Sequence, residues 1–247
     1  MVKKILNIVL WVATGVALAL LFMSGRKRYL DTPISGIRVN IERGHDKGFV
    51  DDDSLVAYAE AVSGIARGAA SSSVDMQRIN RMMEDNPWIE RGSAYIGLDN
   101  MLTINAKEYE PVMRIYDQDG KSSYITNEGI IIPSSPHYTP HLIIASGNFN
   151  DSTDVTEALS IAQAISGDDY LASHIGQIYR NRDNEYELAV NNLPARVVIG
   201  DTQAIGDKLW RLRTLLEKYY NTEELTVYKT LDLRYKNQIV CTKKIKL

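Results

Sequence analysis

The chain has 247 residues, of which 45% are hydrophobic and 24% are charged, a composition that excludes disorder and suits one or two packed domains. Residues 29–247 carry 23 Lys and Arg against 31 Asp and Glu, an acidic balance that argues against nucleic-acid binding. The single cysteine, Cys241, excludes a disulfide bond within the chain.

The chain opens with an apolar segment. Residues 5–23 form a run of 19 residues without a charge, which as a helix is long enough to cross a hydrocarbon core of about 30 Å. Basic residues flank the run on both sides, so they do not decide its orientation. A cleaved signal peptide is the alternative, but the run exceeds a typical signal core, and Ser24 and Gly25 lead straight into Arg26 without an A-x-A site directly before them. We predict an uncleaved transmembrane helix over residues 5–25.

The next segment is predicted to form a strand and two helices. Apolar residues at 37, 39 and 41 alternate with polar ones, which is typical of a half-buried strand. Asp51–Asp53 can cap a helix that Gly64 ends. A second helix places four apolar residues on one stripe and stops at Pro87; those residues are Met76, Ile79, Met82 and Met83.

Two strands and a tight turn follow these helices. Residues 89–109, "IERGSAYIGLDNMLTINAKEY", divide at Asp99-Asn100 into two alternating strands, a predicted hairpin. The order is therefore strand, helix, helix, strand, strand. We expect Trp88 to fill the space between helix and sheet, because an aromatic residue after a helix-ending proline commonly folds back on the core.

This order, together with residues 74–115, resembles the POTRA domain of the bacterial cell-division proteins FtsQ and DivIB. In that family a helix ending in Pro-Trp, here Pro87 and Trp88, leads into a strand, a short turn and a strand. The second strand closes on an acidic residue and a proline, here Glu108 and Pro111. The resemblance implies that a β-rich domain follows.

The second half of the chain agrees with this resemblance. "YITNEGIIIP" (124–133) is similar to the family's passage into its second domain. Amphipathic helices are predicted at 154–166 and 207–220, and "YELAVNNLPARVVIG" (186–200) reads as two strands. "TLDLRYKNQIV" resembles the closing Asp-Leu-Arg-Tyr strand, here Asp232 to Tyr235.

The predicted fold class is α+β: an N-terminal transmembrane helix, a POTRA domain (β-α-α-β-β) and a β-rich domain with flanking helices. The expected boundaries are a cytoplasmic tail at 1–4, the transmembrane helix at 5–25, the POTRA domain at 34–112 and the β domain at 113–247.

Few residues have the spacing of a catalytic or metal site. The four histidines form no His-Glu-x-x-His pattern and are interpreted as loop or surface residues; they are His45, His137, His141 and His174. Asp51–Asp53 are interpreted as a helix cap. Gly200, Gly206 and Lys208 imitate a phosphate loop with the wrong spacing, so we expect a strand-to-helix turn. Cys241 is expected to be a small packed side chain. We predict no catalytic residue, cofactor or metal.

The resemblance implies a non-enzymatic function. Family members are single-pass inner-membrane proteins with a cytoplasmic N-terminus and a periplasmic bulk, located at the division septum. They bind the bitopic proteins FtsB and FtsL and help to control septal peptidoglycan synthesis, and their contacts can extend to the septal synthase complex. The partner adds a strand at the C-terminal sheet edge, which here comprises Arg234, Tyr235, Gln238, Ile239, Val240, Cys241 and Thr242.

The orientation of the closing strand is open. Alternation along the strand leaves Tyr235 either in the core or at the interface, whereas Arg234 is expected to be accessible.

Two other functions are alternatives to the division scaffold. An anchored cell-wall enzyme would need a cleft of converging acids or histidines. A POTRA module for outer-membrane protein assembly or secretion precedes a large membrane domain, for which the helices predicted at 154–166 and 207–220 leave no room.

Overall fold

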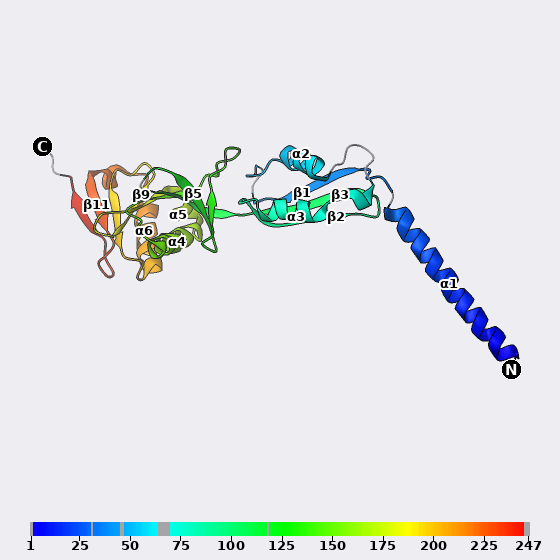
Figure 1. The fold of residues 1–247 in the computed structure, drawn as a ribbon. Helices are drawn as coiled ribbons and strands as arrows, with labels where there is room; N and C mark the ends of the chain where they lie inside the picture. Colours follow the sequence, from blue (N-terminus) through cyan, green and yellow to red (C-terminus); the bar gives the residue numbers. More distant parts are fainter. Residues whose placement is uncertain (1, 31, 45–46, 64–69, 118, 245–247) are drawn as a thin grey trace. The chain divides into compact units, whose positions relative to one another are not determined.

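The chain divides into two compact units, Met1–Glu108 and Tyr109–Leu247 (Figure 1). The structure is a computed structural model that describes residues 2–30, 32–44, 47–63, 70–117 and 119–244, with side chains at all of these except 2–8, 26–30 and 62–63. Two predicted features, His45 and the helix end at Gly64, lie outside the described residues. The division at Glu108 falls shortly before the expected boundary, because Pro111 and Val112 already belong to a strand of the second unit.

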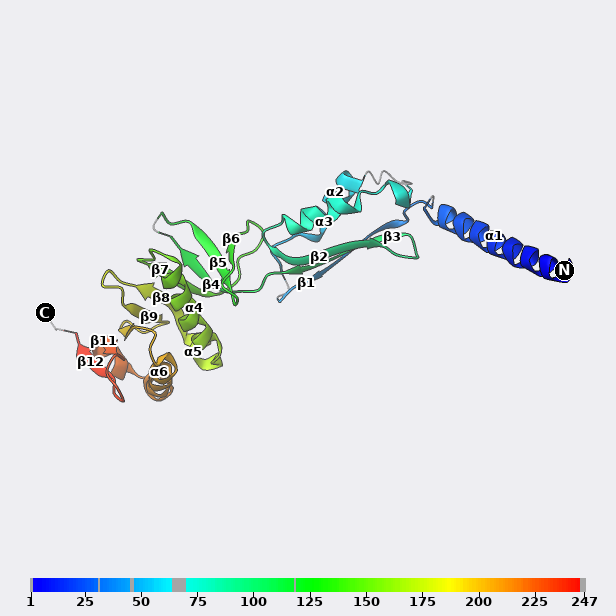
Figure 2. The same cartoon turned by 60° about the horizontal axis from the view of Figure 1, so that its bottom comes forward.

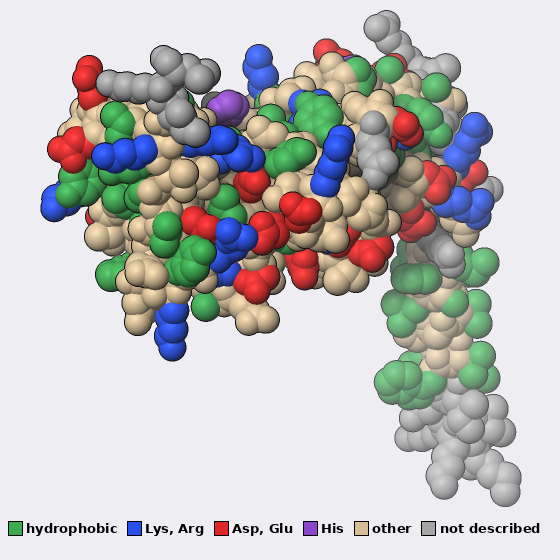
Figure 3. Space-filling view, turned by 90° about the vertical axis from the view of Figure 1, so that its left-hand side faces the viewer, with side chains coloured by type: hydrophobic (Ala, Val, Ile, Leu, Met, Phe, Trp, Pro, Cys, Tyr) green, Lys and Arg blue, Asp and Glu red, His purple; other side chains and the backbone are tan. Residues whose placement is uncertain are grey.

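The first unit begins with helix α1 (Val2–Leu30). Large apolar side chains of this helix are exposed, and Figure 3 shows them around its described part. Within the described residues, no helix combines the length and the apolar character that crossing a membrane requires. The transmembrane span predicted at residues 5–25 is therefore unconfirmed.

The rest of the first unit is a small sheet covered by helices. The predicted order of strand, helix, helix, strand, strand is confirmed, with a short 3-10 helix, η1, between the two α-helices. The elements are β1 (Gly36–Glu42), α2 (Asp52–Ser63), η1 (Ser71–Ser73), α3 (Met76–Glu84), β2 (Ile89–Ile96) and β3 (Met101–Glu108). In the described part of the chain these strands form a three-stranded sheet ordered β1-β3-β2. β1 runs parallel and β2 antiparallel to β3.

The apolar stripes recognised in the sequence make the core of this unit. Figure 2 shows α2 and α3 on the same side of the sheet. Leu55 of α2 and Ile79 of α3 are buried against Ile104 of β3. Trp88 packs against the same cluster and is half-buried. The sequence period of each helix thus selects the face that it buries.

Buried Glu108 ties the end of β3 to the loop before α2. Its carboxylate accepts hydrogen bonds from the N–H groups of Phe49 at 2.9 Å and Val50 at 3.0 Å. The next helix is capped by Asp51, whose carboxylate accepts from the Ser54 N–H at 3.1 Å. The structural interpretation of Asp51 is therefore confirmed, since a side-chain acceptor satisfies an N–H group at a helix start.

The second unit is a large mixed sheet with helical crossovers. Its elements are β4 (Pro111–Tyr116), β5 (Ser122–Thr126), β6 (Ile131–Pro133), β7 (Ile143–Gly147), α4 (Ser152–Ser166), α5 (Asp169–His174), β8 (Ile175–Arg180), β9 (Tyr186–Val190), β10 (Arg196–Gly200), α6 (Ile205–Tyr219), η2 (Glu223–Val227), β11 (Tyr228–Asp232) and β12 (Val240–Lys243). Among the described residues the sheet has nine strands, ordered β12-β11-β10-β9-β8-β7-β4-β5-β6. The parallel pairs β7–β8 and β10–β11 are joined through α4–α5 and α6, as parallel neighbours require a crossover.

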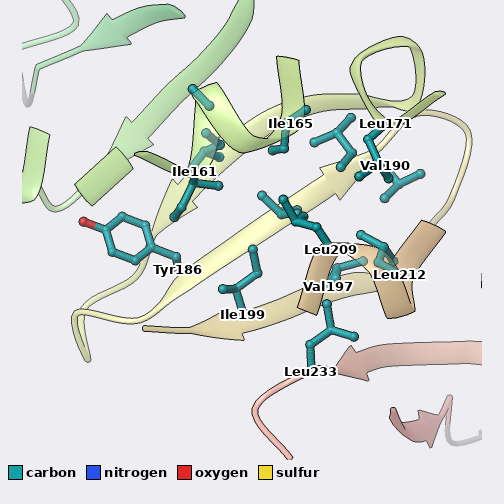
Figure 4. Packing of buried hydrophobic residues seen from close by; sticks show 14 of the residues in the cluster. Ile161, Ile165, Leu171, Tyr186, Val190, Val197, Ile199, Leu209, Leu212 and Leu233 are labelled. Carbon is teal, nitrogen blue, oxygen red and sulfur yellow. The ribbon is translucent and has the colours of Figure 1, made fainter. Parts of the chain in front are cut away.

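One apolar cluster joins these helices to the sheet. Figure 4 shows Leu209 and Leu212 of α6 above Val197 and Leu233, with Ile161 of α4 farther along the same core. The predicted helices at 154–166 and 207–220 and the predicted strands within 186–200 are confirmed. The mixed α+β class, with a large sheet, is confirmed as well.

His174 corrects the interpretation of the histidines as loop or surface residues. It is the last residue of α5 and is half-buried. Its ring stacks on Tyr170 at 4.2 Å between centroids and meets the Tyr220 ring edge at 4.4 Å. The sequence does not reveal this, because Tyr220 comes from a distant segment.

Candidate functional site

The candidate site is the outer side of β12 together with the connection that leads into it. β12 pairs with β11 in antiparallel register, with Cys241 opposite Leu231 and Val240 opposite Asp232. It is the last strand of the sheet, so in the described structure a strand covers only one of its sides. All four of its residues are exposed. An edge of this kind offers main-chain N–H and C=O groups to an added strand.

The strand beneath this edge is firmly held. Leu231 and Leu233 are fully buried against α6 and β10, and Figure 4 shows Leu233 beside Val197. The Leu233 N–H also donates to the Val198 carbonyl at 2.8 Å. β11 therefore holds β12 in a fixed position. A partner strand can then recognise the main chain of β12 in one defined geometry.

The predicted closing strand from Asp232 to Tyr235 is wrong in its extent, because β11 ends at Asp232. The Asp232 carboxylate accepts a hydrogen bond from the Arg234 N–H at 3.0 Å. Such a local side-chain acceptor competes with the strand ladder and turns the chain. Likewise Gln238 and Ile239 precede the strand, which starts at Val240.

Arg211 of α6 holds the connection between β11 and β12. Its guanidinium is buried and donates to the carbonyls of Leu233 at 3.2 Å and Tyr235 at 2.8 Å, and also to the carbonyl of Gln238. Asp207, one turn earlier, accepts from its Nε at 3.1 Å. One side chain thus fixes both ends of the turn that leads into the edge strand.

Arg234 is fixed by two carboxylates. Its Nη2 lies 2.6 Å from Asp232 Oδ2, and its Nη1 lies 2.7 Å from Glu185 Oε1. The hydrogen bonds to Asp232 are the main cause that raises the pKa of Arg234 above its ordinary value. The same pair lowers the pKa of Asp232. The guanidinium remains partly exposed, as the sequence predicts, and is held in one orientation.

We expect acid to weaken this pair. Because folding lowers the pKa of Asp232 below 3.8, the pair stabilises the folded state above that pH and loses its effect as the pH falls through the lowered value. Asp232→Asn should therefore lower the urea midpoint at about pH 7, and the difference from the parent should shrink below about pH 4. Urea titrations across this range measure it, with exposed Asp119→Asn as control. A constant difference would contradict the pairing.

A pocket of about 240 Å³ lies beside Arg234. It is lined by Asn184, Glu185, Gly200, Asp201, Lys208 and Arg234. Lys208 is buried and donates to Asp201 Oδ1 at 2.6 Å. Since Asp201 and Glu185 neutralise the two cations, the pocket has no excess positive charge for a phosphate. Gly200 and Lys208 thus serve the predicted strand-to-helix turn, between β10 and α6.

Gly200 is required by this geometry. It has φ of +77°, and an added Cβ would lie 2.8 Å from Arg234 Cγ. A side chain at position 200 would therefore strain the backbone and displace Arg234.

The remaining predicted site residues are exposed. Tyr235 is 48% exposed, so it lies on the surface rather than in the core. Cys241 is also exposed, which corrects its interpretation as a packed side chain. In the described part of the chain all four residues of its strand are exposed, and alternation alone does not reveal that. Among the described residues, no group of three or more His, Cys, Asp or Glu could hold a metal ion.

The sequence does not single out Arg211 or Glu185, and it gives Asp232 only as a strand residue and not as a partner of Arg234. The available signal was the position of two basic residues, Lys208 and Arg211, next to the buried positions of an amphipathic helix. A cation at such a position requires acceptors from elsewhere in the fold. Nothing in the sequence showed that the acceptors of Arg211 would be carbonyl groups beside β12.

Comparison with known proteins supplies the family. A sequence model described as FtsQ/DivIB, C-terminal related matches residues 110–242, from just before β4 to Thr242 in β12. A comparison with curated proteins gives no match. The matched region covers more than half of the chain and nearly the whole second unit, including the exposed edge. The chain therefore belongs to the FtsQ/DivIB family of bacterial cell-division proteins.

Proposed function

We propose that this protein is a non-enzymatic scaffold of the division apparatus, which binds FtsB-like and FtsL-like bitopic proteins through the outer side of β12. The observation that carries the proposal is the position of β12: it ends the sheet, all of its residues are exposed, and the family match extends into it. Strand addition needs an accessible main chain rather than catalytic groups.

Each part of the site has a role in this proposal. A partner strand pairs with β12 through main-chain hydrogen bonds, which supply affinity. Arg234 and Tyr235 lie where the chain turns toward that strand, and they give side-chain contacts. Aromatic and Arg residues with low conformational freedom are the usual strong contributors at interfaces. Arg234 meets this condition because Asp232 and Glu185 hold it in place.

We further propose that α1 anchors the protein in the inner membrane by a single pass, with the N-terminus in the cytoplasm. The uncharged run at residues 5–23 and the exposed apolar side chains of α1 support an anchor. Residues 34–112 would then act as a POTRA domain on the periplasmic side, and its three-stranded sheet with two covering helices supports that assignment. Binding at the septum places the protein where it can help to control peptidoglycan synthesis.

The proposal is tested by depletion in the native bacterium. Cells that lose the protein should grow into filaments blocked at division, and the intact chain should restore septation. A chain that retains residues 1–239, and so keeps the buried Leu231 and Leu233 but lacks β12, should not restore it. Normal division after depletion would reject the scaffold function.

A further inference from the structure

The turn between β2 and β3 carries an unusually exposed leucine. Leu98 is 93% exposed, at a position where turns usually carry polar residues. The turn is well ordered: the Asn100 N–H donates to the Gly97 carbonyl at 3.0 Å, and the Gly97 N–H donates to the Met101 carbonyl at 3.0 Å. Leu98 is therefore held out at the tip of a rigid hairpin.

This tip is tied to the chain that comes from α1. The Ser35 N–H donates to the Asn100 carbonyl at 2.9 Å, and the Ser35 hydroxyl donates to the Asp99 carbonyl at 3.0 Å. α1 ends at Leu30, and the five residues from there to Ser35 span at most about 18 Å. Whatever the tilt of α1, the tip cannot lie far from its last residue.

The charges and the exposed tyrosine near the tip suit a lipid surface. Arg38 lies 3.6 Å from the carboxylate of Asp99, which offsets the acid of the turn. Tyr95, near the end of β2 that leads into the turn, is 52% exposed, and tyrosine favours the membrane–water interface. The sequence adds a basic run at residues 26–28, a type of segment that anionic headgroups attract.

From this we infer that the β2–β3 tip, residues 97–100, contacts the membrane surface, with Leu98 entering the interfacial layer and Tyr95 at the headgroups. The inference rests on the proposed anchoring by α1. It gives the first unit a second point of contact with the lipid, so that the connection from α1 is not all that sets its distance from the membrane.

The test uses the full chain in vesicles of phosphatidylcholine and phosphatidylglycerol. Cys241→Ser removes the one native thiol, and an NBD fluorophore is then attached at Leu98→Cys. The matched control is Arg91→Cys, an exposed position near the other end of β2. A third probe at Leu18→Cys in α1 reports on the anchor separately. Lipids spin-labelled near the headgroup, or deep in the acyl chain, quench probes that reach those depths.

We expect shallow-label quenching at Leu98 to exceed that at Arg91 several-fold, with a blue-shifted emission. In a Tyr95→Cys probe, Leu98→Asp should reduce the quenching, whereas Leu98→Ile should retain it. Equal quenching at Leu98 and Arg91 overturns the inference, as does a probe shift at Leu98 that appears only on adding a partner protein. Deep quenching at Leu18 combined with no quenching at Leu98 overturns the hairpin contact alone. No quenching at Leu18 rejects the proposed anchor.

Discussion

Proline in β12 should weaken partner binding without unfolding the protein, provided that it replaces an outward N–H group. N–H groups of consecutive strand residues point to opposite sides, so Val240→Pro and Cys241→Pro place the lost donor on opposite sides of β12. One variant breaks the ladder with β11, and the other removes only the donor offered to a partner. We expect the variant that keeps the ladder with β11 to retain its melting temperature and to lose affinity for the partner about tenfold or more.

Calorimetry with the FtsB-like partner measures the affinity of each variant, and thermal unfolding identifies the one that remains stable. Val240→Thr is the matched control, because it keeps the N–H group, the β-branched shape and the exposure of the site. It should bind like the parent protein. If the stably folded proline variant also binds like the parent, β12 is not the edge that the partner completes.

Replacing Arg211 should destabilise β12 without changing any residue of that strand. Arg211→Met removes the donor that reaches the buried carbonyl of Leu233, and a buried carbonyl left without a partner costs about 1–3 kcal/mol. The carbonyls of Tyr235 and Gln238 lose the same donor. We expect a lower urea midpoint, faster hydrogen exchange in residues 240–243 and weaker partner binding, although no exposed side chain of the edge has changed.

Arg213→Met is the matched control for this prediction. Arg213 lies on the same helix, but its partners are Asp168 and Glu217, away from β12. Its loss should change stability by about 1 kcal/mol or less, as is usual for partly exposed ion pairs, and should leave exchange in β12 unaltered. If both variants affect β12 equally, the effect belongs to α6 as a whole and not to the Arg211 contacts.

The sequence by itself determined most of the local structure. The spacing of apolar residues predicts the helices α3, α4 and α6, because residues three and four apart line the buried face of each helix. Turn chemistry placed the β2–β3 hairpin, where Asn100 adopts a left-handed conformation with φ of 57°. The closing segment is also predicted to be a strand, through its resemblance to the family's Asp-Leu-Arg-Tyr strand.

Only the tertiary structure decided what the C-terminal segment does. The alternation of apolar and polar residues does not show whether a strand lies inside a sheet or at its edge, since the order of strands depends on long-range pairing. β12 turned out to be the last strand, so Cys241 lies in solvent and not in a core. Tyr235 is exposed because β11 ends at Asp232, where a carboxylate takes the next free N–H group and Arg211 holds the following carbonyls. The Arg211 contacts join residues that are 22 to 27 positions apart, a separation at which the sequence carries no geometric signal.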